Sequence, residues 1–419
     1  MNEESKMIHI SPIITRNFPK EVFKDFLRPY KLCSQFVNSG KEIHHFLQEQ
    51  LNENNIPVQE LEEFLYKELL YGSQREIYVY NIFSFNDSLQ NPTKLVDMIK
   101  ANYKYIEQLN FNKILYQPVD DEIEDLVAIR VIMALDGYNI KKINMIFSVK
   151  CEIFDSISSR HSEYSYITVD LDFNYKTLYL KLKPKSKIGN ENNVPSQLLE
   201  LYSEKVKKMF NIQYQEFCGL HRHTLCNMNI DLYKQVYQKM VQSQPGLDNY
   251  IQQISKDIIN KLNIDDYENK VADNNVFNIE DIIRKTMEHA QISDILYEKN
   301  VGDLEDVNGY VNYIKFSDGT NISARIRSEN QITPIFASEA FMALRSSINN
   351  AQKISILKIF WLNNFFGLRV SYEAIDNTYL KIRLYKNHTK EEFEYAIKKY
   401  RECEERTITE NPGIFRLEA

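Results

Sequence analysis

The alternation of apolar and polar residues between 165 and 183 constrains the fold more than any other feature of this sequence. Ile167, Val169 and Leu171 alternate with polar residues, a turn follows near Asn174-Tyr175, and the alternation resumes at 178. Pairing 171 with 178, 169 with 180 and 167 with 182 puts every apolar residue on one face, and a slip of one residue would break this arrangement. The pattern predicts an antiparallel hairpin with one apolar face and one outer face.

Two further hairpins follow the same logic. Near the C-terminus, apolar residues at 368, 370 and 372 can face those at 384, 382 and 380 across a tight loop at 375–377. Residues 310–316 and 322–326 flank Asp318-Gly319, a dipeptide typical of hairpin turns. We expect this third hairpin to extend the sheet of the second one.

The first two hairpins resemble each other. Residues 179–183 read Tyr-Leu-Lys-Leu-Lys and residues 379–383 read Tyr-Leu-Lys-Ile-Arg. Helical patterns follow at 195–210 and at 389–400, where Thr389 and Glu392 form a capping box. A helix, three strands and a helix, at 121–211 and again at 336–402, would be two copies of one unit. Chance similarity of short Lys/Ile/Leu strands stays open, as does a strand in place of the first helix at 127–135.

The remaining segments complete an α+β fold class. Apolar spacings of three and four residues predict helices across 20–72, a strand follows at 75–85, and Asn91-Pro92 begins another helix. Helices are also expected at 231–240, 247–262 and 279–297. We therefore predict two possibly duplicated αβββα units with antiparallel sheets, divided as an N-terminal mixed α/β region (1–115), the first αβββα unit (116–215), a helical connector (216–303) and the second αβββα unit with an added hairpin (304–419).

Composition limits the function classes. The 419 residues carry a formal net charge of −7, which argues against a generic nucleic-acid or membrane-surface binder. The five cysteines are sparse, and no run approaches the ~20 apolar residues of a membrane span. We expect a cytoplasmic protein without membrane contact. Abundant Asn, Ile and Lys indicate an AT-rich bacterial genome, and we expect a mobile-element or phage-defence context.

The outer face of the first hairpin combines lysines with aromatic rings, and the outer face of the second hairpin repeats this in part at 379–383. Ammonium groups beside aromatic faces can hold phosphates and stack bases, and tyrosines also suit protein interfaces. Lysines on an exposed strand can instead serve to prevent edge-to-edge pairing. The candidate partner-binding residues are Tyr166, Tyr179, Lys181, Lys183, Lys185, Lys187, Tyr379, Lys381 and Arg383.

A short Cys/His segment could hold a soft metal. Its four potential ligands are Cys218, His221, His223 and Cys226. Structural zinc sites normally use two ligand pairs separated by a loop of about a dozen residues or more, so nine residues alone are too short. An ordinary junction between a loop and a helix is the alternative.

No catalytic motif is present. Nucleophile elbows, phosphate-binding glycine loops and dinucleotide fingerprints are all missing from the sequence. The sequence therefore predicts a non-enzymatic binding or assembly protein, without a cofactor, that presents exposed sheet faces to a protein or a nucleic acid, and homo-oligomerisation stays open. One alternative is a metal-dependent hydrolase or nuclease, with a metal ion held by Asp170 and Asp172 beside Lys181 or by the Cys/His segment. The other is a small-ligand sensor.

Overall fold

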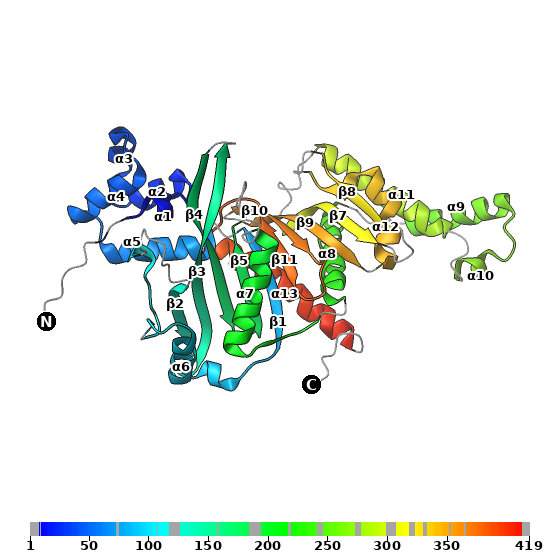
Figure 1. The fold of residues 1–419 in the computed structure, drawn as a ribbon. Coiled ribbons are helices and arrows are strands. Elements are labelled where there is room, and N and C mark those ends of the chain that lie inside the picture. The colour runs from blue at the N-terminus through cyan, green and yellow to red at the C-terminus, as the bar shows by residue number, and fades with distance from the viewer. Residues whose placement is uncertain are drawn as a thin grey trace. The chain divides into compact units, whose positions relative to one another are not determined.

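The computed structural model confirms the α+β class (Figure 1). The chain divides into two compact units. Unit 1 comprises Met1–Phe217 and Asp376–Tyr395, and unit 2 comprises Cys218–Ile375 and Ala396–Ala419. This grouping differs from the four predicted regions, because residues 376–395 belong with the N-terminal part of the chain. The structure describes residues 8, 10–72, 75–106, 108–116, 126–156, 159–183, 194–216, 219–240, 246–272, 278–298, 307–317, 323–329, 333–351, 353–363 and 366–412.

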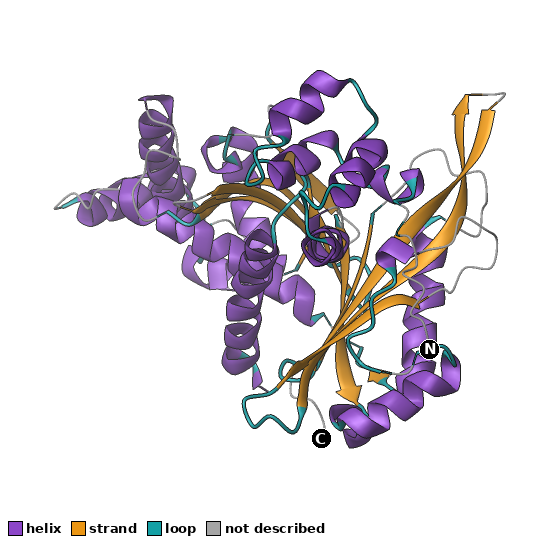
Figure 2. Ribbon diagram, turned by 90° about the vertical axis from the view of Figure 1, so that its left-hand side faces the viewer, coloured by secondary structure: helices purple, strands orange, loops and turns teal. Residues whose placement is uncertain are grey.

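Unit 1 contains an antiparallel sheet with a central β5. Its strands run in the order β2 (Leu126–Met133), β3 (Ile140–Ser156), β4 (Ser159–Asp172), β5 (Thr177–Leu182), β1 (Glu76–Ser84) and β11 (Leu380–Leu384). The short β6 (Gln213–Tyr214) pairs with the end of β1. Strands from both ends of the sequence thus lie side by side, and β3 and β4 continue together as a long two-stranded ribbon (Figure 2).

The predicted register of the first hairpin is confirmed. Leu171 lies opposite Leu178, Val169 opposite Leu180 and Ile167 opposite Leu182. All six side chains belong to a buried apolar cluster, where α6 (Pro92–Asn102) and α7 (Pro195–Phe210) also contribute residues. The apolar face of the hairpin is therefore a core face, as the alternation requires.

The second face of this sheet is also covered, and the prediction that it is exposed was wrong. Within unit 1, helix α1 (Pro12–Thr15) and the π-helix η1 (Glu68–Gly72) both contact strand β4. Tyr166, Tyr179 and Lys181 are 2%, 3% and 0% exposed. Because β5 lies between β4 and β1, its lysine does not protect a free edge either.

The helices of unit 1 follow the sequence expectations. Helical periodicity across 20–72 corresponds to α2 (Lys20–Leu27), α3 (Cys33–Ser39), α4 (Ile43–Asn52), α5 (Val58–Lys67) and η1. Short 3₁₀ turns lie at η2 (Asp87–Gln90) and η3 (Ile114–Tyr116). The capping box that starts α13 (Lys390–Glu410) is confirmed, since the Thr389 N–H donates to Glu392 Oε2 at 2.9 Å and the Glu392 N–H donates to Thr389 Oγ1 at 3.2 Å.

In the described part of the chain, unit 2 contains four antiparallel strands of the sheet. Its strands run in the order β10 (Phe366–Glu373), β9 (Ile354–Asn363), β7 (Gly309–Ser317) and β8 (Ser323–Arg327). The predicted pairing of β7 with β8, and its extension of the sheet through β9, are confirmed, while the turn at 318–319 lies outside the described residues. The helical elements of unit 2 are α8 (Leu220–Met240), α9 (Leu247–Leu262), α10 (Tyr267–Ala272), α11 (Ile279–Glu298), η6 (Ile335–Ala337), α12 (Glu339–Ala351) and the part of α13 from Ala396.

The proposed duplication is not confirmed. Residues 126–133 form strand β2. The prediction that the first copy begins with a helix was therefore wrong, and the alternative prediction, a strand, is confirmed. The corresponding segment of the second copy is helix α12. The β-branched residues of β2 pair along β3 through Ile129 and Val131, and this pairing outweighs any helical pattern. Strands β10 and β11 both form with buried alternate residues, but β10 belongs to unit 2 and β11 to unit 1.

Among the described residues, no helix has both the length and the apolar character that crossing a membrane requires.

Candidate functional site

The predicted basic and aromatic face forms an internal contact layer. Lys183 donates to the Asn17 backbone oxygen at 2.6 Å, and Lys381 and Arg383 pair with Glu76 at 3.1 and 2.7 Å. Tyr379 is half-buried against Tyr78 and Tyr80. Lys185 and Lys187 lie outside the described residues. Tyr78 pairs with Leu180 in β5 and with Lys381 in β11, so Tyr379, Lys381 and Arg383 lie on the opposite sheet face from Tyr179, Lys181 and Lys183. The structure therefore divides these candidates between two faces, and on both faces they contact the protein itself.

Lys181 is the centre of a buried ion network. Its Nζ lies 3.8 Å from Asp170 Oδ2, and Lys142 Nζ approaches Asp170 Oδ1 at 3.1 Å. The Lys181 ammonium also lies 4.5 Å from the ring centroid of Tyr71 and 4.6 Å from that of Phe393. A buried ammonium is tolerated only with such charge and cation–π partners. The network therefore joins β3, β4 and β5 to the layer that covers them.

Burial has the largest effect on the pKa values of Lys181 and His388. It lowers the pKa of Lys181 to about 8, although the Asp170 charge acts in the opposite direction. Burial, with the charge of Lys181 second, lowers the pKa of the nearby His388 to about 3. His388 is therefore neutral at physiological pH, while Lys181 lies close to its titration point.

The two carboxylates considered for a metal have other roles. Asp170 is ion-paired with two lysines, and Asp172 Oδ1 accepts the N–H groups of Asn174 and Tyr175 at 3.1 and 3.3 Å. Asp172 therefore caps the β4–β5 turn. Neither carboxylate is open to solvent in unit 1.

A cavity of about 640 Å³ opens elsewhere on unit 1. Three elements meet around it: helix α7, the segment 213–216 that includes β6, and the residues that precede β11. Strand β1 contributes one ring. The lining residues are Tyr80, Ser196, Leu199, Glu200, Ser203, Glu204, Lys207, Gln213, Tyr214, Gln215, Glu216, Asp376, Thr378 and Tyr379.

Three tyrosine rings form one wall of this cavity. The Tyr80 centroid lies 4.7 Å from that of Tyr214 and 5.5 Å from that of Tyr379. The Tyr214 hydroxyl donates to the Ser203 backbone oxygen at 2.9 Å, which fixes the ring relative to α7. Pairing of Ile82 in β1 with Tyr214 in β6 holds the rings together. The aromatic wall is thus preorganised by backbone pairing and by a helix contact.

The charges of the cavity are mainly negative. Among the described residues that line it, Glu200, Glu204, Glu216 and Asp376 are accompanied by one cation, Lys207. Burial raises the pKa of Tyr80, and the neighbouring Tyr379, Asp376 and Glu204 act in the same direction. Burial likewise raises the pKa of Tyr214, with Tyr80 and Glu204 contributing. The Tyr80 and Tyr214 rings therefore remain neutral phenols, and the faces of neutral aromatic rings attract cations.

Lys207 already uses this chemistry. Its Nζ lies 3.2 Å from Glu204 Oε1 and 6.0 Å from the Tyr214 ring centroid. Its side chain is 42% exposed. A ring face and a carboxylate thus hold an ammonium at the edge of the cavity.

The sequence analysis missed most of this cavity. Tyr379 was a candidate, but Tyr80 and Tyr214 were not. Residues 200, 204 and 207 are spaced by four and three, so they share one face of α7, and that face could have indicated a charged surface. No local pattern relates α7 to the two-residue strand β6.

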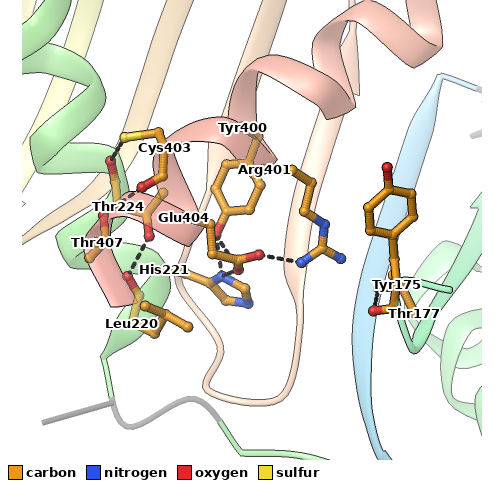
Figure 3. A network of polar contacts seen from close by, with 10 residues as sticks. All are labelled: Tyr175, Thr177, Leu220, His221, Thr224, Tyr400, Arg401, Cys403, Glu404 and Thr407. Atoms are coloured by element: carbon orange, nitrogen blue, oxygen red, sulfur yellow. Dashed lines mark hydrogen bonds and ion pairs between the residues drawn. The ribbon is translucent and has the colours of Figure 1, made fainter. Parts of the chain in front are cut away.

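His221, His223 and Cys226 of the Cys/His segment lie at the start of α8 in unit 2, and His221 enters a buried network there (Figure 3). His221 Nδ1 contacts the Tyr400 hydroxyl and lies 3.5 Å from Glu404 Oε1. The Tyr400 hydroxyl donates to Glu404 Oε1 at 3.1 Å, and Arg401 pairs with Glu404 Oε2. Burial raises the pKa of Glu404, but the Arg401 charge and the His221 hydrogen bond outweigh it and lower the pKa to about 2.

The predicted metal ligands are not brought together where they can be described. His223 is half-buried, and burial raises the pKa of the Cys226 thiol to about 11. Cys218 lies outside the described residues. Among the residues that the structure describes, no three His, Cys, Asp or Glu side chains form a metal-binding group. What can be seen of the segment is a loop-to-helix junction that anchors α8 on α13.

Comparison with known proteins finds no match for this chain among family models, curated proteins or solved structures.

Proposed function

We propose that this chain is a non-enzymatic binding protein, and that the cavity of unit 1 recognises a positively charged segment of a protein partner. The observation that carries the proposal is the combination, in one open cavity, of three tyrosine rings with four carboxylates and, among the described lining residues, one ammonium. In this proposal the cavity replaces the sheet faces that the sequence predicted as the binding surface, because Tyr166 and Tyr179 on those faces are buried.

The physical argument rests on two additive attractions. An ammonium or guanidinium over a tyrosine face is stabilised by about 0.5–1 kcal/mol at an exposed site. Carboxylates around the same position add Coulomb attraction, which also speeds association and weakens with salt. Rings that are already packed need little further ordering on binding.

The same charges favour a protein over a nucleic acid. Phosphates would meet Glu200, Glu204, Glu216 and Asp376 in the cavity, and like charges in a binding site are repelled. Lys181, one of the lysines expected to contact phosphates, is buried inside unit 1. A basic polypeptide is therefore the better partner for this surface.

The setting of the protein belongs to the same proposal. Cys33, Cys226 and Cys403 are free thiols, which suits a reducing compartment, and we propose a cytoplasmic location. A role in bacterial antiviral defence remains a proposal from composition alone.

Calorimetric titration of the full chain with a Lys/Arg-containing peptide tests the proposal. The cavity variant Glu200→Gln/Glu216→Gln removes two exposed carboxylates without changing their shape. A matched control, Glu42→Gln/Glu53→Gln, removes two exposed carboxylates of unit 1 that do not line the cavity. We expect the cavity variant to bind about tenfold more weakly than the control. Equal peptide affinity of the two variants would contradict the proposal.

A further inference from the structure

Lys207 occupies the position where the proposed cationic ligand would bind. It extends from the last turn of α7, and its ammonium lies between Glu204 Oε1, at 3.2 Å, and the Tyr214 ring, at 6.0 Å. We infer that Lys207 is an internal competitor that a ligand ammonium displaces, so that its presence sets the affinity of the cavity. This inference rests on the proposed function.

The side chain is placed so that it can leave. Lys207 and Glu204 are 42% and 46% exposed, and exposed ion pairs are worth about 0–1 kcal/mol. The lysine stem carries several rotatable bonds, so its head group can turn into solvent without moving the helix. Displacement therefore needs no unfolding of α7.

The competitor also indicates the ligand class. An alkylammonium is the group that the protein itself seats against Tyr214 and Glu204, so the same group from outside the chain fits the same contacts. A lysine side chain of a basic polypeptide and a free polyamine share this chemistry. The cavity of about 640 Å³ leaves room for neighbouring residues of a polypeptide.

Binding is then an exchange of one ammonium for another. Glu204 and Tyr214 keep a cation throughout, and the net gain of the ligand comes from its further contacts with Tyr80, Tyr379 and the remaining carboxylates. Removing the internal cation should therefore tighten binding rather than weaken it. Loss of a contact residue would have the opposite effect.

Titration of three lysine variants tests this inference. Lys207→Met removes the competitor, Lys207→Arg retains a cation, and Lys208→Met removes the adjacent exposed charge that does not line the cavity. The probes are a peptide of Gly-Ser-Lys repeats and, separately, spermidine. We expect Lys207→Met to bind the peptide about three- to tenfold tighter than the natural chain. Lys208→Met should change the affinity less than twofold, and Lys207→Arg should resemble the natural chain.

The outcomes separate the two proposals. Peptide binding that Lys207→Met leaves unchanged, weakens, or tightens only as much as Lys208→Met overturns the role of Lys207 and leaves the proposed function standing. Absence of peptide binding in the natural chain and in every variant overturns both. Tightening for both probes supports the inferred chemistry, and the probe with the lower Kd identifies the source of the ammonium. Thermal unfolding of each variant, expected within about 2 °C of the natural chain for a surface change, verifies that the fold is intact.

Discussion

Among the sites of unit 1 where an ammonium lies beside an aromatic ring and a carboxylate, those of Lys181 and Lys207 differ clearly in exposure. Lys181 is fully buried between Tyr71 and Phe393 and pairs with Asp170, whereas Lys207 lies beside Tyr214 and Glu204 with 42% of its side chain exposed. Both locations use the same attractions. Solvent access therefore decides whether an ammonium site belongs to the fold or can be exchanged with a ligand.

The expected contributions to the free energy of unfolding differ in the same way between buried and exposed pairs. Removing one partner of a buried pair leaves an uncompensated charge and costs about 3–5 kcal/mol, whereas an exposed pair contributes about 0–1 kcal/mol. A buried network thus stabilises one arrangement of strands, and an exposed one can open under thermal motion. The predictions below test this division, from the largest expected effect on stability to the smallest.

Asp170→Asn should have the largest effect. It removes the carboxylate shared by Lys142 and Lys181, and we expect the free energy of unfolding to fall by about 3–5 kcal/mol in denaturant titrations. The double variant Asp170→Asn/Lys181→Met removes the buried ammonium as well and should recover most of the loss. A loss below about 1 kcal/mol for the single variant would show that the pair does not stabilise the sheet.

Glu404→Gln extends the test to a buried carboxylate in unit 2. The folded-state pKa of about 2 lies below the usual value of 4.5, so Glu404 stabilises the protein above pH 4.5, and this contribution is lost as pH falls from 4.5 toward 2. We expect the variant to lose about 2–3 kcal/mol at neutral pH, because Arg401 loses its buried charge partner. The difference from the natural chain should disappear in acid, and a difference independent of pH would contradict this assignment.

Lys181→Met should change the response to alkaline pH. The pKa of about 8 in the folded protein lies below the 10.5 of the unfolded chain, so the unfolded state binds the proton more tightly between these values. Relative to Lys181→Met, the natural chain should gain about 2 kcal/mol of stability from pH 8 to pH 9.5. Equal pH dependence of the two proteins in urea titrations would show that the ammonium is not desolvated.

The exposed cavity carboxylates should affect stability least. We expect Glu200→Gln/Glu216→Gln to change the free energy of unfolding by less than about 0.5 kcal/mol, since surface substitutions rarely do more. The same variant should weaken peptide binding. A loss of stability comparable to that of Asp170→Asn would break the comparison, because the cavity charges would then belong to the fold.

Local patterns predicted local structure well. The alternation at 167–182 specified the register of β4 and β5, because a slip of one residue would have exposed the apolar residues. Thr389 and Glu392 predicted the start of α13 because a capping box is completed within four residues. Each prediction depended only on neighbours in sequence or on one short turn.

Long-range neighbours explain what was missed. Whether the polar face of β5 meets solvent depends on η1, about 110 residues upstream, and on Phe393, about 210 residues downstream, and no pattern within the hairpin reports either. The aromatic wall of the cavity likewise needs β1, β6 and the segment before β11 to converge. Tyr80 and Tyr214 have no feature in sequence that distinguishes them from the other tyrosines of the chain.

A direct competition between partner classes is the most decisive measurement. The full chain would be titrated at low and moderate salt with a lysine-rich peptide and with a single-stranded oligonucleotide of equal charge magnitude. We expect peptide binding that weakens with salt and with Glu200→Gln/Glu216→Gln, and little oligonucleotide binding. Tight oligonucleotide binding with no peptide binding would contradict the assignment of this cavity to a cationic partner.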